Sequence, residues 1–258
     1  MTTEKKTEYR APALEKGLEI LELLAFEEEP LTKKQIAEKL ERSVNEIFRM
    51  LSVLIDKQYI EFDNDSSVYS MTLKMFALSN QHPPVAQLLK RAQPLMEKLS
   101  LKLNQSCHLS RYKNGELIVI ARSESPYKMG FGLRLGASLD ICASGSGVAL
   151  LSFSVEDKRQ AILSKIDASK DEIQNTLSHI KETVKKGYFA GVSPQISGVT
   201  NISVPILGVQ DDVMAVLTIP YMTLNSATVH HHIEDIEHAR IELLYVAQKL
   251  SQNREIYL

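Results

Sequence analysis

The sequence predicts an α+β protein with two domains, an N-terminal winged helix-turn-helix domain and a C-terminal domain of helices packed on an antiparallel sheet. Apolar residues recur at helical spacing through residues 13–54, where a short polar break divides two helices. From Ser106 the apolar period changes to two, which is typical of strands with one buried face. A break that contains two adjacent prolines separates the two patterns. We therefore expect domains over residues 1–72 and 85–258, joined by a linker helix and a breaker over residues 73–84.

Residues 31–54 predict two short helices that share a tight turn. Thr32 is a suitable N-cap for the first helix, and Ser43 is a suitable N-cap for the second. The expected buried positions are Ile36, Ala37 and Leu40 in the first helix and Ile47, Met50, Leu51 and Leu54 in the second. This spacing predicts a helix-turn-helix, whose second helix is free to enter the major groove of DNA.

Two further elements complete a winged module. Residues 58–71 alternate in the manner of two strands joined by a turn at residues 64–66, which predicts a hairpin, or wing. Residues 13–26 carry leucines at helical spacing and predict a helix that covers the back of the motif. We expect these elements to form one compact domain.

Eight residues of the helix-turn-helix are candidates for contact with double-stranded operator DNA. Lys33, Lys34 and Arg42 can reach phosphates, which position a protein on the duplex. Residues on the outward face of the second helix can meet base edges in the major groove. These candidate readers are Ser43, Val44, Asn45, Glu46 and Arg49.

A small α-helical bundle would show the same three-helix pattern, and the charge of the domain does not separate the two interpretations. Residues 1–80 hold eleven Lys or Arg against fifteen Asp or Glu, a net charge of about −4, whereas a DNA-binding module is usually basic. The acidic residues concentrate in the first helix and its exit, while residues 32–49 hold five basic against three acidic side chains. We expect weak non-specific DNA binding that depends strongly on salt.

The second domain is predicted to combine helices with a sheet. A helix is expected over residues 85–104, and Lys113-Asn114-Gly115 is a strong turn signal between strands at residues 107–112 and 116–123. Further strands are expected at residues 128–133, 200–207 and 213–221, with a turn at residues 210–212. Further helices are expected at residues 145–153, 155–166, 170–186 and 229–253. Such a combination is typical of an α+β sensor-like domain.

Length and composition limit the class of protein. The chain has 258 residues, 44% hydrophobic residues and a formal net charge of −2, which suits two soluble domains with buried cores. It has no apolar run long enough to cross a bilayer and no secretory signal, so we expect a cytoplasmic location and no membrane partner. Cys107 and Cys142 lack metal-ligand spacing, and the adjacent His230, His231 and His232 cannot easily converge on one ion. We expect no metal site and no cofactor.

Several segments form a specific pattern through their order and spacing. In the first domain they are residues 13–24, residues 31–40 and the segment from Arg49-Met-Leu to Ile60. In the second domain they are Arg134-Leu-Gly136, Ala143-Ser-Gly-Ser-Gly147 with the Ala149-Leu-Leu151 that follows, Lys186-Gly-Tyr188 and Ile202-Ser-Val-Pro-Ile206. With these segments the chain resembles the IclR (isocitrate-lyase regulator) family of bacterial transcription factors over nearly its whole length.

The resemblance implies a winged helix-turn-helix domain joined by a linker helix to a GAF-like effector-binding domain, assembled as a homodimer or as a homotetramer of two dimers. It implies a repressor or dual regulator whose operator binding changes when a small metabolite, often an organic or aromatic acid, binds the second domain. The positions that line the ligand pocket in such proteins are Phe131, Gly145, Ser146, Asn201 and Thr218. Independently of the resemblance, residues 144–147 open a helix whose unpaired amides can donate hydrogen bonds to a carboxylate. An ordinary helix start, in which glycine only allows close backbone packing, is the alternative interpretation of these residues.

Several positions depart from the pattern of the family. Asn201 stands where a cysteine is frequent, Pro220 where a pocket serine is frequent, and Cys142 where a histidine is common. In the helix-turn-helix, Glu41 replaces the usual turn glycine and Val44 replaces the usual lysine. We therefore expect an effector and an operator that differ from the well-known ones.

Two other classes of function are compatible with parts of the sequence. An enzyme could use Ser144 or Ser146 as a nucleophile, but Gly145-Ser-Gly147 lacks the Gly-x-Ser-x-Gly spacing of a nucleophile elbow, so we expect no catalytic residue. A protein-interaction module with a degenerate helix-turn-helix is the remaining alternative, in which the acidic first helix contacts a protein. Loss of DNA affinity when Asn45 and Arg49 are replaced would favour the regulator over that module.

Overall fold

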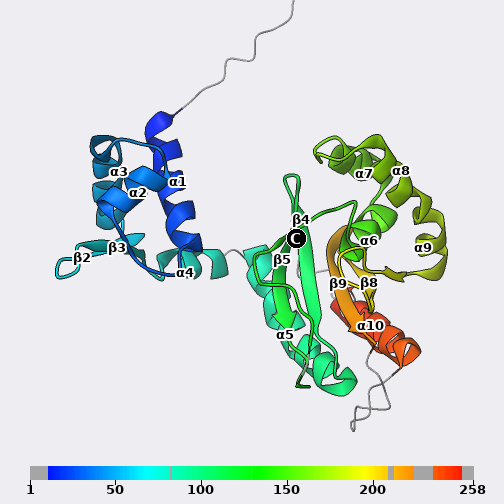
Figure 1. Cartoon of the computed structure of the whole chain (residues 1–258). Coiled ribbons are helices and arrows are strands. Elements are labelled where there is room, and N and C mark those ends of the chain that lie inside the picture. The colour runs from blue at the N-terminus through cyan, green and yellow to red at the C-terminus, as the bar shows by residue number, and fades with distance from the viewer. Residues whose placement is uncertain (1–10, 82, 129, 209–211, 224–234, 252–258) are drawn as a thin grey trace, which may run out of the picture. The chain divides into compact units, whose positions relative to one another are not determined.

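The computed structural model describes residues 11–81, 83–128, 130–208, 212–223 and 235–251 (Figure 1). The chain divides into two compact units, Met1–Pro83 and Pro84–Leu258. The first unit is mainly helical with a small sheet, and the second is built on a larger sheet.

The first unit is a winged helix-turn-helix, which confirms the predicted fold. Its helices are α1 (Pro12–Phe26), α2 (Lys33–Lys39), α3 (Val44–Asp56) and α4 (Lys74–Asn80). Its strands are β1 (Leu31–Thr32), β2 (Ile60–Asp63) and β3 (Val68–Met71). The strands form an antiparallel sheet in the order β1-β3-β2, and the β2–β3 hairpin is the wing.

Local sequence determines where the two helices of the helix-turn-helix begin. The Thr32 hydroxyl accepts a hydrogen bond from the Gln35 amide (3.3 Å) and the Gln35 side chain accepts one from the Thr32 amide (2.8 Å), which closes a capping box at α2. Ser43 and Glu46 close the same box at α3. Between the helices, Glu41 has a left-handed backbone with a φ of 52°. Glycine adopts this conformation without a Cβ penalty, which explains why glycine is usual at this turn.

Helices α1, α2 and α3 bury one apolar core. Ile20 of α1, Ile36 of α2 and Ile47 of α3 are fully buried in it, together with Leu51 and Ile60. Because Ile47 and Leu51 of α3 point into this core, the opposite face of α3 lies at the surface.

The second unit is a three-layer α+β structure. Its six strands are antiparallel to their neighbours and have the order β6-β5-β4-β9-β8-β7. The strands are β4 (Cys107–Lys113), β5 (Glu116–Ser123), β6 (Ser138–Leu139), β7 (Phe189–Val192), β8 (Val199–Leu207) and β9 (Val213–Met222). The helices are α5 (Pro83–Leu103), α6 (Gly145–Phe153), α7 (Glu156–Leu163), α8 (Lys170–Ser178), α9 (Ile180–Lys186) and α10 (Ile236–Ser251).

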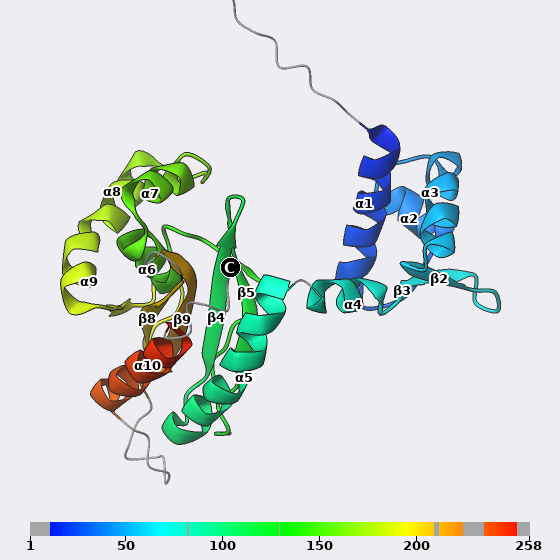
Figure 2. The same cartoon turned by 180° about the vertical axis from the view of Figure 1, so that it is seen from behind.

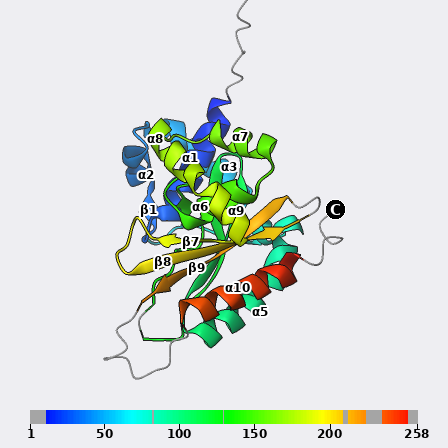
Figure 3. The same cartoon turned by 90° about the vertical axis from the view of Figure 1, so that its right-hand side faces the viewer.

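Helices cover both faces of this sheet. α5 and α10 lie along one face, where Leu88, Met96 and Leu243 are buried against strand residues (Figure 2). α6 to α9 lie on the other face, where Leu150 and Leu151 of α6 are buried (Figure 3). The glycine-rich start of α6 therefore lies directly on the sheet.

Three predictions about the second unit need correction. Residues 128–133 were expected to form a strand, but those that the structure describes are irregular, because Gly130 and Gly132 carry no side chain to pack and the edge of β5 pairs with residues 136–139 instead. The helix expected over residues 170–186 divides at His179 into α8 and α9, both of which contact α6. The helix expected over residues 155–166 is the shorter α7.

Some elements of the structure were not predicted from the sequence, and some predictions fall on residues outside the described part of the chain. The two-residue strands β1 and β6 and the glycine-containing β7 were missed. The turn at residues 210–212 lies largely outside the described residues, as do residues 229–234 of the last predicted helix and the triplet at residues 230–232.

Candidate functional site

The exposed face of α3 is a candidate surface for contact with the DNA major groove. Val44, Asn45, Phe48 and Arg49 are all exposed on it, within the first two turns of the helix. Asn and Arg side chains can each make paired hydrogen bonds to a base edge, Asn to adenine and Arg to guanine. This surface therefore combines two polar side chains, Asn45 and Arg49, with two apolar side chains, Val44 and Phe48.

Three of the predicted contact residues hold the module together. Glu46 accepts hydrogen bonds from the Ser43 amide and hydroxyl, and its carboxylate lies 2.9 Å from the Lys16 ammonium of α1. The hydrogen bond from Lys16, followed by those from Ser43, lowers the pKa of Glu46 to about 2. Arg42 donates to both carboxylate oxygens of Glu19 at 3.1 Å. Ser43, Glu46 and Arg42 thus fix α3 against α1.

The two lysines at the start of α2 differ in their surroundings. The Lys33 ammonium lies 5.0 Å from the centre of the Phe48 ring, a cation–π contact that joins α2 to α3. Lys34 is highly exposed and lies 3.6 Å from the Glu38 carboxylate. Phe48 itself was not among the predicted contact residues, although its spacing of four residues from Val44 places both on one side of α3.

The wing carries negative charge rather than the positive charge that suits phosphate contacts. Asp63 and Asp65 lie at or next to its tip, Glu61 lies on β2, and residues 58–73 contain no Lys or Arg. Asp63 accepts hydrogen bonds from the Ser66 hydroxyl and from the Asp65 amide, which lower its pKa. The wing tip is therefore anionic and does not favour contact with phosphates.

In the second unit, a cavity of about 260 Å³ lies at the start of α6. Ser144 caps the helix by accepting a hydrogen bond from the Gly147 amide at 3.1 Å. Among the described residues, the Gly145 and Ser146 amides have no hydrogen-bond acceptor, so the helix presents free donors there. The cavity is lined by Cys142, Ala143, Ser144, Gly145, Val148, Glu172, Asn175, Thr176, His179, Phe189, Val192, Pro194 and Asn201.

Close packing makes Gly145 part of the cavity wall. A Cβ atom at this position would lie 2.7 Å from the Asn201 Cβ and 3.1 Å from the Phe189 ring. Glycine therefore lets α6 approach β8 and leaves the helix start open to a small molecule.

The five predicted pocket residues divide into three groups. Gly145 and Asn201 line the cavity, whereas the partly buried Phe131 does not. Ser146 and Thr218 are 2% and 1% exposed and lie behind the cavity wall. The sequence did not predict that Asn175, Thr176, His179 and Phe189 line the cavity, because neither helical spacing nor strand alternation shows which face of an element meets a cavity.

Ser146 and Thr218 belong to a buried chain of polar side chains. The Ser146 hydroxyl lies 2.9 Å from that of Thr218 and 3.2 Å from His108 Nε2, and the Thr218 hydroxyl donates to that of Ser203 at 2.8 Å. His108 Nδ1 is buried without a hydrogen-bond partner, and burial lowers the pKa of His108 to about 4. A neutral imidazole is therefore part of this chain.

The described part of the chain contains neither a cluster of metal-binding side chains nor a membrane-spanning helix. No group of three or more His, Cys, Asp or Glu side chains there is placed to hold a metal ion. Nor is any helix in those residues long and apolar enough to span a membrane.

Family models match both units. The model described as the bacterial transcriptional regulator IclR C-terminal domain matches residues 84–251, and the model of the IclR helix-turn-helix domain matches residues 13–64. The chain belongs to the IclR family. It is thus a transcriptional regulator of the DNA-binding, helix-turn-helix type, as the sequence predicted.

Curated relatives and solved structures agree with this assignment. The chain is 23% identical over 230 residues to the transcriptional regulator KdgR of Dickeya chrysanthemi, covering 86% of this chain and 73% of KdgR. It is 22% identical over 215 residues to the transcriptional repressor AllR of Salmonella paratyphi A, covering 81% of this chain and 79% of AllR.

Two solved structures share the fold of this IclR-family chain. An IclR homologue from Microbacterium hydrocarbonoxydans, complexed with 4-hydroxybenzoate, has a TM-score of 0.78 at 18% identity over 94% of this chain and 99% of that chain. The Thermotoga maritima IclR has a TM-score of 0.72 at 20% identity over 95% and 98% of the two chains.

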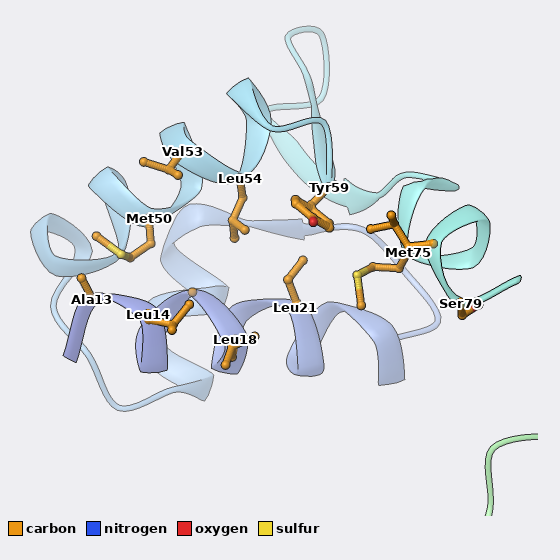
Figure 4. A pocket seen from close by; sticks show the side chains of 12 residues that line it. Ala13, Leu14, Leu18, Leu21, Met50, Val53, Leu54, Tyr59, Met75 and Ser79 are labelled. Carbon is orange, nitrogen blue, oxygen red and sulfur yellow. The ribbon is translucent and has the colours of Figure 1, made fainter. Parts of the chain in front are cut away.

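The first unit of this IclR-family chain also carries an apolar groove of about 750 Å³. Met50, Leu54, Leu21 and Met75, from three helices, border it (Figure 4). The remaining lining residues are Ala13, Leu14, Gly17, Leu18, Val53, Tyr59, Leu78 and Ser79. Several of these apolar side chains are exposed, which is typical of a surface that binds another protein.

Proposed function

We propose that this IclR-family regulator binds an operator through the exposed face of α3 and that a small anionic effector, bound at the start of α6, changes operator affinity. The two-unit architecture carries the proposal, because a surface suited to the major groove and a cavity at a helix N-terminus lie on separate units. A repressor or a dual regulator of this kind acts through a coupling free energy between the two sites.

In this proposal, DNA contacts divide between positioning and base reading. Lys33, Lys34 and Arg42 contact phosphates, with Arg42 exchanging its bond to Glu19 for the phosphate. Asn45 and Arg49 read base edges, while the other predicted residues support them. The supporting residues are Ser43 and Glu46, which cap α3, and Val44, which lies beside the readers.

The first test is selection of genomic fragments by the purified protein at controlled salt, followed by footprinting of what is enriched. We expect an enriched pseudo-palindrome, and we expect Arg49→Ala to weaken binding to it by about 5- to 150-fold, because a paired contact to a base contributes about 1–3 kcal/mol. Replacement of Arg134, an exposed arginine of the second unit, is the matched control and should leave affinity unchanged. Enrichment with no effect of Arg49→Ala would contradict the residue assignment. No enrichment by an intact oligomer would favour a protein-binding role instead.

The effector is proposed to be a small carboxylic acid. In this proposal the Gly145 amide at the start of α6 donates a hydrogen bond to its carboxylate, and the Phe189 ring and the Asn201 side chain line the same cavity. The Microbacterium relative was solved with 4-hydroxybenzoate, so this acid heads the set of compounds to titrate.

The selected operator also serves to test the effector. Titration with 4-hydroxybenzoate and other small carboxylic acids is expected to change operator affinity by about 5- to 150-fold at saturation for an acid that fits. Gly145→Ala should remove this response and leave affinity without ligand intact, because its methyl group intrudes on Asn201 and Phe189. An equal response from both proteins would rule out this cavity as the effector site.

The protein is further proposed to form a homodimer or a larger homo-oligomer in which the apolar groove of each first unit is covered by a second copy. A symmetric dimer presents two recognition helices to two half-sites, and α1 and α4 supply the exposed apolar surface.

Leu18→Glu is expected to convert the oligomer to a smaller species. Leu18 lines the groove on α1, and a buried charge at an interface costs about 2 kcal/mol or more, or about 30-fold in dissociation constant. Sedimentation velocity over a concentration series measures this change. Leu135→Glu, at an exposed leucine of the second unit, is the control. A Leu18→Glu protein that sediments like the wild type would contradict the placement of the interface.

A further inference from the structure

The recognition face of α3 contains two exposed apolar side chains that the proposed hydrogen-bond readers do not explain. Val44 is 38% exposed and Phe48 is 52% exposed, although the module has a well-filled core. They are four residues apart and therefore neighbours on one flank of the helix. This flank forms an apolar strip, defined as Val44 and Phe48, beside Asn45 and Arg49.

The apolar strip does not belong to the groove of the first unit. α3 contributes Met50, Val53 and Leu54 to that groove, and neither residue of the strip lines it. The Phe48 ring faces α2 instead, where the Lys33 ammonium lies 5.0 Å from the ring centre. A second copy seated in the groove would therefore leave the strip exposed to DNA.

The chemistry of the major groove offers one apolar feature that matches such a strip. Thymine presents its C5-methyl group there, and the other three bases present only hydrogen-bonding groups or C–H edges. The Lys33 ammonium can contact a phosphate while it remains over the ring, which would hold Phe48 against the edge of the bases.

We propose that Val44 and Phe48 specify thymine in each half-site by packing on its C5-methyl group, next to the bases that Asn45 and Arg49 read. The inference rests on the proposed function, since it assigns bases to the surface that is proposed to bind the operator. Burial of one methyl group contributes about 0.8 kcal/mol, which corresponds to about fourfold in affinity.

The test replaces thymine with deoxyuridine, which removes the methyl group and keeps base pairing. Duplexes are first selected from a random pool, and each thymine of the enriched sequence is then replaced in turn. For the wild-type protein we expect about fourfold weaker binding at one or two thymines per half-site. For Phe48→Ala we expect weaker binding to the thymine duplex and a thymine-to-deoxyuridine ratio near one at the position that Phe48 contacts.

Two comparison variants separate this effect from a general loss of binding. Arg49→Ala should weaken binding and keep the fourfold preference for thymine, because it removes a different base contact. Leu135→Ala, at an exposed leucine of the second unit, should change neither quantity.

The outcomes distinguish failure of the inference from failure of the proposed function. If no sequence is enriched, operator binding itself fails and the inference fails with it. If a sequence is enriched but thymine and deoxyuridine duplexes bind equally well, operator binding stands and thymine reading is wrong. If Phe48→Ala and Val44→Ala both keep the full preference for thymine, the preference arises elsewhere and these residues are not the readers.

Discussion

Replacing Gly147 with alanine is expected to lower the free energy of unfolding of the C-terminal unit by about 3 kcal/mol, the upper end of the usual range for overpacking. A Cβ atom at Gly147 would lie 2.1 Å from the Ile141 carbonyl oxygen and 2.5 Å from the Ile141 Cα. Real Cβ atoms do not approach backbone so closely, and a backbone segment cannot rotate away as a side chain can. The start of α6 would therefore have to move off the segment before it.

Urea denaturation of the full chain, followed by circular dichroism, measures this loss. Gly132→Ala is the matched control, because its Cβ would meet Ser106 at an ordinary 3.6 Å and the position is exposed. We expect the control to stay within about 0.5 kcal/mol of the wild type. Equal denaturation midpoints for Gly147→Ala and Gly132→Ala would show that α6 is not held as closely as the structure places it.

The two glycines of the Ser144-Gly-Ser-Gly147 segment therefore have different structural roles. Gly147 faces the chain that precedes α6 and permits close packing of backbone on backbone. Gly145 faces β8 and keeps the cavity open beside Asn201. Both substitutions force a neighbour to move, but Gly147→Ala meets backbone whereas Gly145→Ala meets side chains of the cavity wall. The larger loss of stability is therefore expected at Gly147, and the loss of the effector response is expected at Gly145.

The helix-turn-helix could be predicted from sequence because its signals are local. Thr32 and Ser43 each meet the residue three positions later in a capping box, and the spacing of Ile36 and Ile47 fixes the buried faces. The hairpin turn at Asn114-Gly115 is equally local. Such elements depend on neighbours within about four residues along the chain, which a single sequence displays directly.

Other features could not be predicted because they depend on distant parts of the chain. β6 has two residues and exists because Ser138 and Leu139 meet the edge of β5. The described residues around Gly130 and Gly132 form no strand, because the edge of β5 is taken by residues 136–139. The position of a polar residue relative to the cavity also depends on distant contacts. Ser146 lies behind the cavity wall because α6 packs on the sheet with this hydroxyl against that of Thr218. Phe48 was not predicted to lie on the DNA-facing surface, because large aromatic side chains are usually buried, whereas this one is exposed.

The buried His108 is expected to make the stability of the C-terminal unit fall with pH below neutrality. The ring is 3% exposed, and burial lowers the pKa of His108 to about 4 from an ordinary value near 6.5. Between these two pH values the unfolded chain binds a proton that the folded protein does not, so stability decreases as pH falls from about 6.5 to about 4. The difference in pKa corresponds to about 3 kcal/mol in total, and the contribution is fully present above pH 6.5.

A titration of the free energy of unfolding against pH isolates this contribution when wild type and His108→Gln are compared. Glutamine stays neutral across the range, so carboxylate titrations are shared and the difference between the curves belongs to His108. We expect the variant to be less stable at pH 7, because it leaves the hydrogen-bonded chain of Ser146, Thr218 and Ser203 imperfectly filled, and the deficit should shrink as pH falls toward 4. His179→Gln, at an exposed position, is the control for loss of a histidine, and its free energy of unfolding at pH 7 is expected to stay close to that of the wild type. Parallel curves for His108→Gln and wild type would mean that the His108 imidazole accepts a proton in the folded state, and that water or a ligand group reaches Nδ1 behind the wall of the effector cavity.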